Sequence, residues 1–166
     1  AITLLHSLTI LGAGLPLLQD YPDWVYQSQL LKRYLLGGAV PEPYALKAYP
    51  VPNSLTALGL ALLSTVLPWW IAARLFLVLS AVFVYCAFIA FVAALKRQRA
   101  IWLLAAFPTM FLFGVLYWYG NANYIVGLGV SILTAAIHLR GRLAGWTAVA
   151  LTVFAFFTHG LHYLFV

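Results

Sequence analysis

Charged side chains are scarce in this sequence, and their scarcity limits the kinds of protein it can encode. Of its 166 residues, 7 % are charged and 65 % are hydrophobic, whereas a soluble domain carries about 25 % charged and about 45–50 % apolar residues. So few polar side chains cannot cover a globule in water, and the mean hydropathy of +0.99 agrees. We therefore expect an integral membrane protein.

Carboxylates are the rarest charged groups, because only Asp20, Asp23 and Glu42 carry one. Nine lysines and arginines raise the formal net charge to +6. Such a charge often indicates nucleic-acid binding, but these cations flank apolar segments, where they orient helices in a bilayer. We expect membrane lipids as partners and no nucleic acid.

Cysteine and several catalytic motifs are also missing. The single cysteine, Cys86, excludes an intramolecular disulfide and a CxxC redox or metal motif. Without a P-loop, HExxH, GxSxG or GxGxxG motif, nothing indicates nucleotide hydrolysis, zinc proteolysis, serine hydrolysis or dinucleotide binding. An ion pathway usually needs several charges in mid-span, whereas only Arg74, near the edge of an apolar segment, approaches that position.

Long apolar segments take up most of the chain. Crossing about 30 Å of hydrocarbon requires about 20 helical residues, and six segments approach that length: 1–18, 54–68, 69–94, 100–119, 122–138 and 143–165. We predict an all-α, polytopic transmembrane bundle of five or six spans, a single domain over 1–166, in a membrane of the bacterial cytoplasmic type. Because Ala1 and Val166 lie inside apolar segments, we expect processed ends or a piece of a longer protein.

The long stretch between spans, residues 19–53, contains all three carboxylates and five of the eight prolines. Within it, residues 23–36 have the pattern of an amphipathic helix, with aromatic and leucine side chains on one side and Lys32 and Arg33 elsewhere. Aromatic residues beside cations suit the lipid headgroup level. We expect a surface helix in this first loop, with function concentrated around it.

The distribution of cations predicts the orientation. Cations cluster at 96–99 and 140–142, between apolar segments, so both loops should face the cytoplasm, with 120–123 and 159–162 outside. If every segment spans, the first loop also faces the cytoplasm. If the short segment 54–68 makes only a half-crossing, the first loop faces outward. The sequence leaves both arrangements open.

Several motifs follow one another in a recognisable order. They are LLQDYPDW at 17–24, YPVPN at 49–53, AARL at 72–75, YWYGNANYIVGLG at 117–129 and FFTHGLHYLF at 156–165. This order resembles membrane glycosyltransferases of the C-type fold, which draw sugars from lipid-linked donors. Such enzymes have a second acidic site, whereas this chain has no carboxylate after Glu42. The resemblance therefore implies an N-terminal portion of such an enzyme or a degenerate relative.

The resemblance implies a set of site residues. Asp20, with Asp23 as a substitute, would act as general base toward an acceptor hydroxyl or as a ligand for a divalent cation. A positive charge is needed beside the leaving phosphate. Lys32, Arg33, Lys47 and Arg74 are the candidates for binding the lipid phosphate, and Asn121, Asn123, His159 and His162 for binding the acceptor.

Structural roles are open for the same residues. Asp20 or Asp23 could cap the amphipathic helix and interact with the positive end of its dipole. Arg74 could extend to the headgroups without binding a specific phosphate. Asn121 and Asn123 could satisfy backbone groups in a tight turn.

The histidines support a function of another class. His159 and His162 are three residues apart and share a helix face, and a buried imidazole can ligate haem iron or the magnesium of chlorophyll. The alternative function is therefore an accessory structural or pigment-binding subunit of a respiratory or photosynthetic complex, in contact with other membrane subunits. Packing or headgroup contact is the simpler role for this pair.

Overall fold

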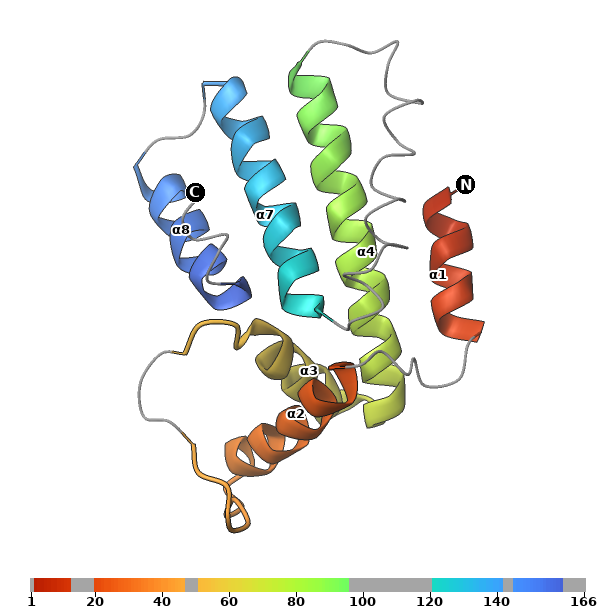
Figure 1. Ribbon diagram of the computed structural model, residues 1–166, viewed down its shortest axis with the longest axis vertical. Helices are drawn as coiled ribbons and strands as arrows, with labels where there is room; N and C mark the ends of the chain where they lie inside the picture. The colour runs from red at the N-terminus through yellow and green to blue at the C-terminus, as the bar shows by residue number, and fades with distance from the viewer. Residues whose placement is uncertain (1, 13–19, 47–50, 96–120, 142–144, 160–166) are drawn as a thin grey trace.

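The computed structural model describes residues 2–12, 20–46, 51–95, 121–141 and 145–159 (Figure 1). Their regular elements are all helices: α1 (Ile2–Gly12), α2 (Tyr21–Leu35), α3 (Leu55–Val66), α4 (Trp69–Ala94), α7 (Ala122–Leu139) and α8 (Trp146–Thr158). The predicted all-α class is confirmed for this part of the chain. The predicted span at 100–119, Lys47 and His162 lie outside the described residues.

The two longest helices, α4 and α7, form the centre of the molecule and run in the same direction (Figure 1). Near their C-terminal ends, Nη2 of Arg140 donates to the carbonyl oxygen of Ala90 at 3.4 Å. α1 packs on α4 and α8 packs on α7, and both run in the opposite direction to the central pair. The four helices therefore lie side by side, with the N-terminal ends of α4 and α7 at one end.

Helices α2 and α3 lie together across that end (Figure 1). α2 occupies residues 21–35, where the sequence predicts an amphipathic helix over 23–36. It ends at a glycine in the left-handed conformation, Gly37, with φ of 82°. α3 has twelve residues, about 18 Å at 1.5 Å per residue, and is too short to cross about 30 Å of hydrocarbon. The described helix therefore does not support a full span over 54–68.

Two of the described helices, α4 and α7, are long and apolar enough to cross a membrane. α4 has 26 residues and α7 has 18. α1 and α8 are shorter, with 11 and 13 residues, and the remainder of the predicted spans 1–18 and 143–165 lies outside the described residues. The predicted number of five or six spans is therefore not shown.

Close packing of α4 against α7 depends on small residues. A Cβ atom added at Gly129 of α7 would lie 2.7 Å from Cε1 of Phe83 on α4, so the helices approach closely where that side chain is absent. The main buried cluster includes Leu60 of α3, Leu77 and Val84 of α4 and Ile125 of α7. This core fixes the end layer, formed by α2 and α3, against the central pair.

Candidate functional site

A cavity of about 690 Å³ opens beside the end layer. Its walls come from α2, the segment after it, the start of α3 and the end of α8. The lining is Trp24, Gln27, Leu30, Leu31, Val40, Tyr44, Ala45, Leu46, Val51, Pro52, Asn53, Ser54, Ala57 and Phe157. The lining is mainly aliphatic, with a few aromatic rings, amides and hydroxyls and no charged side chain, as is usual for sites that bind neutral organic groups.

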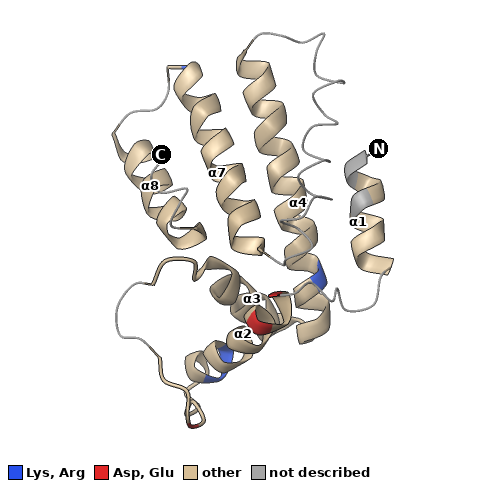
Figure 2. Cartoon of the chain, in the orientation of Figure 1, with Lys and Arg blue, Asp and Glu red and all other residues tan. Residues whose placement is uncertain are grey.

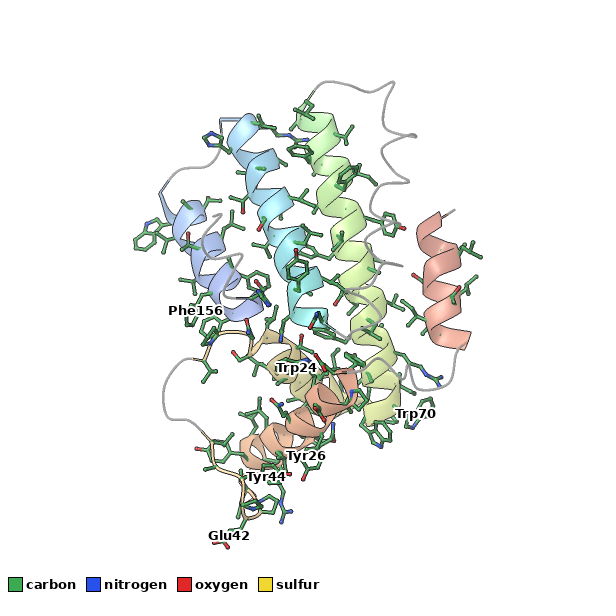
Figure 3. The ribbon with its side chains drawn as sticks, viewed as in Figure 1. Trp24, Tyr26, Glu42, Tyr44, Trp70 and Phe156 are labelled. Carbon is green, nitrogen blue, oxygen red and sulfur yellow. The ribbon has the colours of Figure 1, made fainter. Side chains whose placement is uncertain are left out.

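Figure 3 shows how distant parts of the chain supply these walls. Trp24 lies on α2, Tyr44 lies in the segment beyond it, and Phe156 lies near the end of α8 beside the lining residue Phe157. The rings of Phe156 and Phe157 pack edge to face, with centroids 5.2 Å apart. α8 therefore contributes Phe157, which is distant in sequence from the other lining residues, to the wall of the cavity.

The rim of the cavity is fixed from α7 by Asn123, which is buried. Oδ1 of Asn123 accepts from the backbone N–H of Thr56 at 2.9 Å and from its hydroxyl at 2.7 Å. Its Nδ2 donates to the carbonyl oxygen of Asn53 at 2.6 Å. Asn53 has φ of 63°, a left-handed conformation that asparagine tolerates better than most residues. Asn123 thus holds the wall residue Asn53 and, beside it, Thr56 at the start of α3, and does not line the cavity itself.

The other end of α3 is held by α2. Nζ of Lys32 donates to the carbonyl oxygen of Ser64, in the last turn of α3, where a cation interacts favourably with the helix dipole. Nε2 of Gln29 donates to the hydroxyl of Ser64 at 3.2 Å. Lys32 therefore joins the two helices, while its neighbour Arg33 is exposed.

The two candidate carboxylates lie at the start of α2, and both are exposed. Asp20 occupies the cap position, but its side chain makes no capping hydrogen bond. Its carbonyl oxygen accepts from the N–H of Trp24 at 3.4 Å, which places Asp20 one turn before a lining residue and on the same helix face. Asp23 lies in the first turn, and neither carboxylate lines the cavity.

His159, after the end of α8, lies beside the first turn of α7, the helix that begins next to Asn121 and contains Asn123. Asn121 precedes α7 and makes no side-chain cap. The ring of His159 packs edge to face against Tyr124, with centroids 5.4 Å apart. In the described part of the chain, no group of three or more His, Cys, Asp and Glu side chains could hold a metal ion. Haem or chlorophyll ligation stays a prediction, which a Soret or chlorophyll absorption band of the purified protein would test.

Tyr44 is a cavity residue that sequence reasoning missed. Its ring packs edge to face on Tyr26 of α2, with centroids 5.6 Å apart, and a side-chain hydrogen bond with Tyr44 raises the pKa of Tyr26. This contact holds the segment after α2 against the helix. Tyr44 and Trp24 are aromatic residues of the 19–53 loop, which contains all three carboxylates. Their position in that loop is a signal that could have identified both as cavity residues.

Arg74 lies apart from the cavity, at the junction of α1 and α4. Its Nη1 donates to the carbonyl oxygen of Leu11 at 3.4 Å, and its guanidinium carbon lies 5.6 Å from the centroid of the Trp70 ring. Figure 2 shows the described charged residues gathered mainly around α2 and the adjacent end of α4. The end layer is thus the most polar part of the fold.

Comparison with protein-family models, curated proteins and solved structures gives no match for this chain.

Proposed function

We propose that this protein is a multi-pass membrane protein that transfers a sugar from a lipid-phosphate donor, like the C-type-fold glycosyltransferases that its sequence resembles. The observation that carries the proposal is the cavity of about 690 Å³ with neutral, mainly apolar walls that include Trp24 and Tyr44, next to the amphipathic helix α2. It provides room for a saccharide at the end of the apolar bundle. The donor's hydrocarbon chain would lie in the adjoining lipid.

The direction of the helices supports an outward-facing cavity. α4 and α7 have their C-terminal ends together, and cations follow both ends, at 96–99 and at Arg140. Such loops stay on the cytoplasmic side. Because α3 is too short to span and lies with α2 across the opposite end, the first loop is assigned to the outer side.

The lining suits a neutral sugar. The rings of Trp24 and Tyr44 offer flat apolar surface for the C–H face of a pyranose, while Gln27 and Ser54 carry groups that hydrogen-bond hydroxyls. A pocket with few polar groups on apolar walls orients its ligand through those groups. Sugar binding is therefore assigned to this cavity.

Asp20 is the proposed general base, because it lies one turn from Trp24 on the same face and is not used as a cap. An acceptor hydroxyl oxygen would bond to the anomeric carbon while the bond from that carbon to the phosphate oxygen breaks. The hydroxyl proton would pass to Asp20, and the lipid phosphate would leave with the bonding electrons. Arg33, exposed near the end of α2, is the proposed cation for that phosphate, because its neighbour Lys32 donates to the carbonyl of Ser64.

A binding experiment with two tryptophan variants tests the proposal. Purified protein is titrated with polyprenyl-phosphate hexose, and with polyprenyl phosphate as the sugar-free probe. We expect Trp24→Leu to weaken binding of the sugar-bearing lipid about tenfold, the effect of losing one buried aromatic contact. Trp146→Leu is the matched control, because Trp146 is 87 % exposed on α8 and does not line the cavity. Equal affinity of the native protein for both lipids would overturn the assignment.

A further inference from the structure

Arg74 is an unusual residue for its position, because it lies in the fifth position after the start of the apolar helix α4. We propose that its guanidinium, together with the ring of Trp70, binds the phosphate group of a membrane phospholipid at the α1–α4 junction. This site is separate from the cavity and does not rest on the proposed sugar transfer. Its ligand would be a lipid of the surrounding bilayer.

The hydrogen bonding of Arg74 leaves donors available. A guanidinium has five N–H groups, and the contact of Nη1 with the carbonyl of Leu11, at 3.4 Å, is long. Nε of Arg74 is buried and has no hydrogen-bond partner among the described residues. A buried donor without a partner is rare in folded proteins, so the protein alone leaves this guanidinium incompletely hydrogen-bonded, and its terminal Nη groups are the donors that an outside acceptor can reach.

The neighbours of Arg74 do not supply that acceptor. The adjacent carbonyl, of Ala73, already accepts from the hydroxyl of the buried Tyr21 at 2.6 Å. Among the described residues, Arg74 forms no ion pair with a carboxylate. The contact with Leu11, in the last turn of α1, also interacts favourably with a helix dipole, but it leaves Nε unused.

The surroundings fit a lipid headgroup. Trp69 and Trp70, at the start of α4, are 46 % and 45 % exposed, as expected for tryptophans at the membrane interface. Arg74 lies about 8 Å further along the helix axis, and a long arginine side chain reaches back to the headgroup level. The ring of Trp70 attracts the guanidinium by a cation–π contact.

Phosphate matches the free donors by shape and charge. Arginine binds phosphate through two parallel N–H groups, and Nη1 with Nη2 is such a pair. Because the half-buried guanidinium opens beside apolar helices α1 and α4, the phosphate is assigned to a phospholipid and not to free phosphate. The two sources can be separated by experiment.

Thermal stabilisation by added lipid tests the site. The full chain, purified in a polyoxyethylene detergent, is melted with phosphatidylglycerol, with a neutral glycolipid that lacks phosphate, and with inorganic phosphate. We expect phosphatidylglycerol alone to raise Tm. In Arg74→Gln the phosphatidylglycerol concentration for half of that rise should increase about tenfold, which corresponds to the loss of one charge-assisted contact.

Three variants separate binding from folding. Arg140→Gln removes the same charge at an exposed position after α7, at the opposite end of the bundle, and should keep the native response. Arg74→Lys keeps the charge without the paired donors and should recover only part of it. If Arg74→Gln fails to fold, Trp70→Leu tests the contribution of the Trp70 ring and should reduce the rise in Tm that phosphatidylglycerol causes.

Each contrary result overturns a defined part of the proposal. An equal Tm rise with glycolipid overturns phosphate recognition, and an equal rise with inorganic phosphate overturns the assignment to a lipid. A native response in Arg74→Gln, or an equal loss in Arg140→Gln, overturns the site itself.

Discussion

The α4–α7 pair is joined mainly by apolar side chains, whereas the end layer is fixed by hydrogen bonds at both ends of α3. Val84 of α4 and Ile125 of α7 belong to the same buried cluster, and Gly129 allows a close approach of the two helices. In the end layer, Asn123 holds the start of α3 and Lys32 holds its last turn. Apolar burial holds helices together without specifying direction, while buried polar contacts have defined geometry.

This difference between apolar packing and hydrogen bonding indicates which part of the fold needs side chains in defined positions. The cavity borders the end layer, and two of its lining residues adjoin the hydrogen bonds of Asn123. A bundle that only spans a membrane could use apolar packing alone. We therefore expect the hydrogen bonds of Asn123 and Lys32 to α3 to determine the shape of the cavity. We expect the apolar packing of α4 against α7 to determine the free energy of unfolding of the whole protein.

The largest effect on stability is expected from the apolar pair. Leu77→Ala removes a side chain that is 2 % exposed on α4, and such truncations cost about 2–5 kcal/mol. Leu79→Ala is the matched control, because Leu79 is 49 % exposed on the same helix. Thermal melts in detergent measure both. A similar loss in the two variants would contradict the core described for α4.

A smaller and more local effect is expected from Asn123→Ala. The variant removes three hydrogen bonds and leaves the N–H of Thr56 without its partner, at a cost of about 2–3 kcal/mol. Hydrogen exchange should rise at residues 53–58 before it rises in α4. Asn121→Ala, whose side chain forms no cap, is the control. Uniform loss of protection along the chain would show that Asn123 has no special role at the rim.

Lys32→Met should have an effect of about 1 kcal/mol, because it removes one charge-assisted hydrogen bond at the end of α3 but keeps an apolar stem. Arg33→Met, the next residue along α2, is exposed and should change stability by less than about 0.5 kcal/mol. Chemical denaturation of the two variants distinguishes the neighbours. Equal effects would mean that the contact with Ser64 contributes nothing measurable.

Much of the helical fold follows from the sequence, because long apolar runs and the glycines after α2 are local signals. The role of Asn123 could not be found in the same way. Its three hydrogen bonds join residues 67 to 70 positions apart, and nothing in the motif distinguishes it from Asn121. The aromatic Phe157 and Trp24 likewise share a cavity only because α8 folds back to the end layer.

The segment 54–68 shows the limit of hydropathy. Its composition is that of a span, but α3 stops at Val66, and Pro68 precedes the first residue of α4. A proline lacks the N–H that would continue the helical ladder, so the chain turns after twelve helical residues. α3 has the hydropathy of a span but too few residues to cross a membrane, and it lies against α2 instead.

Asp20→Asn should have the smallest effect on stability, less than about 0.5 kcal/mol, because the side chain is exposed and caps nothing. If Asp20 is the general base, the same change should lower sugar transfer by about 10²–10⁴-fold while the donor lipid still binds. Transfer is measured with polyprenyl-phosphate hexose and a hydroxyl acceptor, and Asp23→Asn is the matched control on the same turn.

Equal losses of transfer in both variants would point to a shared charge effect at the start of α2. Retained transfer in Asp20→Asn would remove Asp20 from the chemistry but leave sugar binding at Trp24 untouched, so the two halves of the proposed function fail separately.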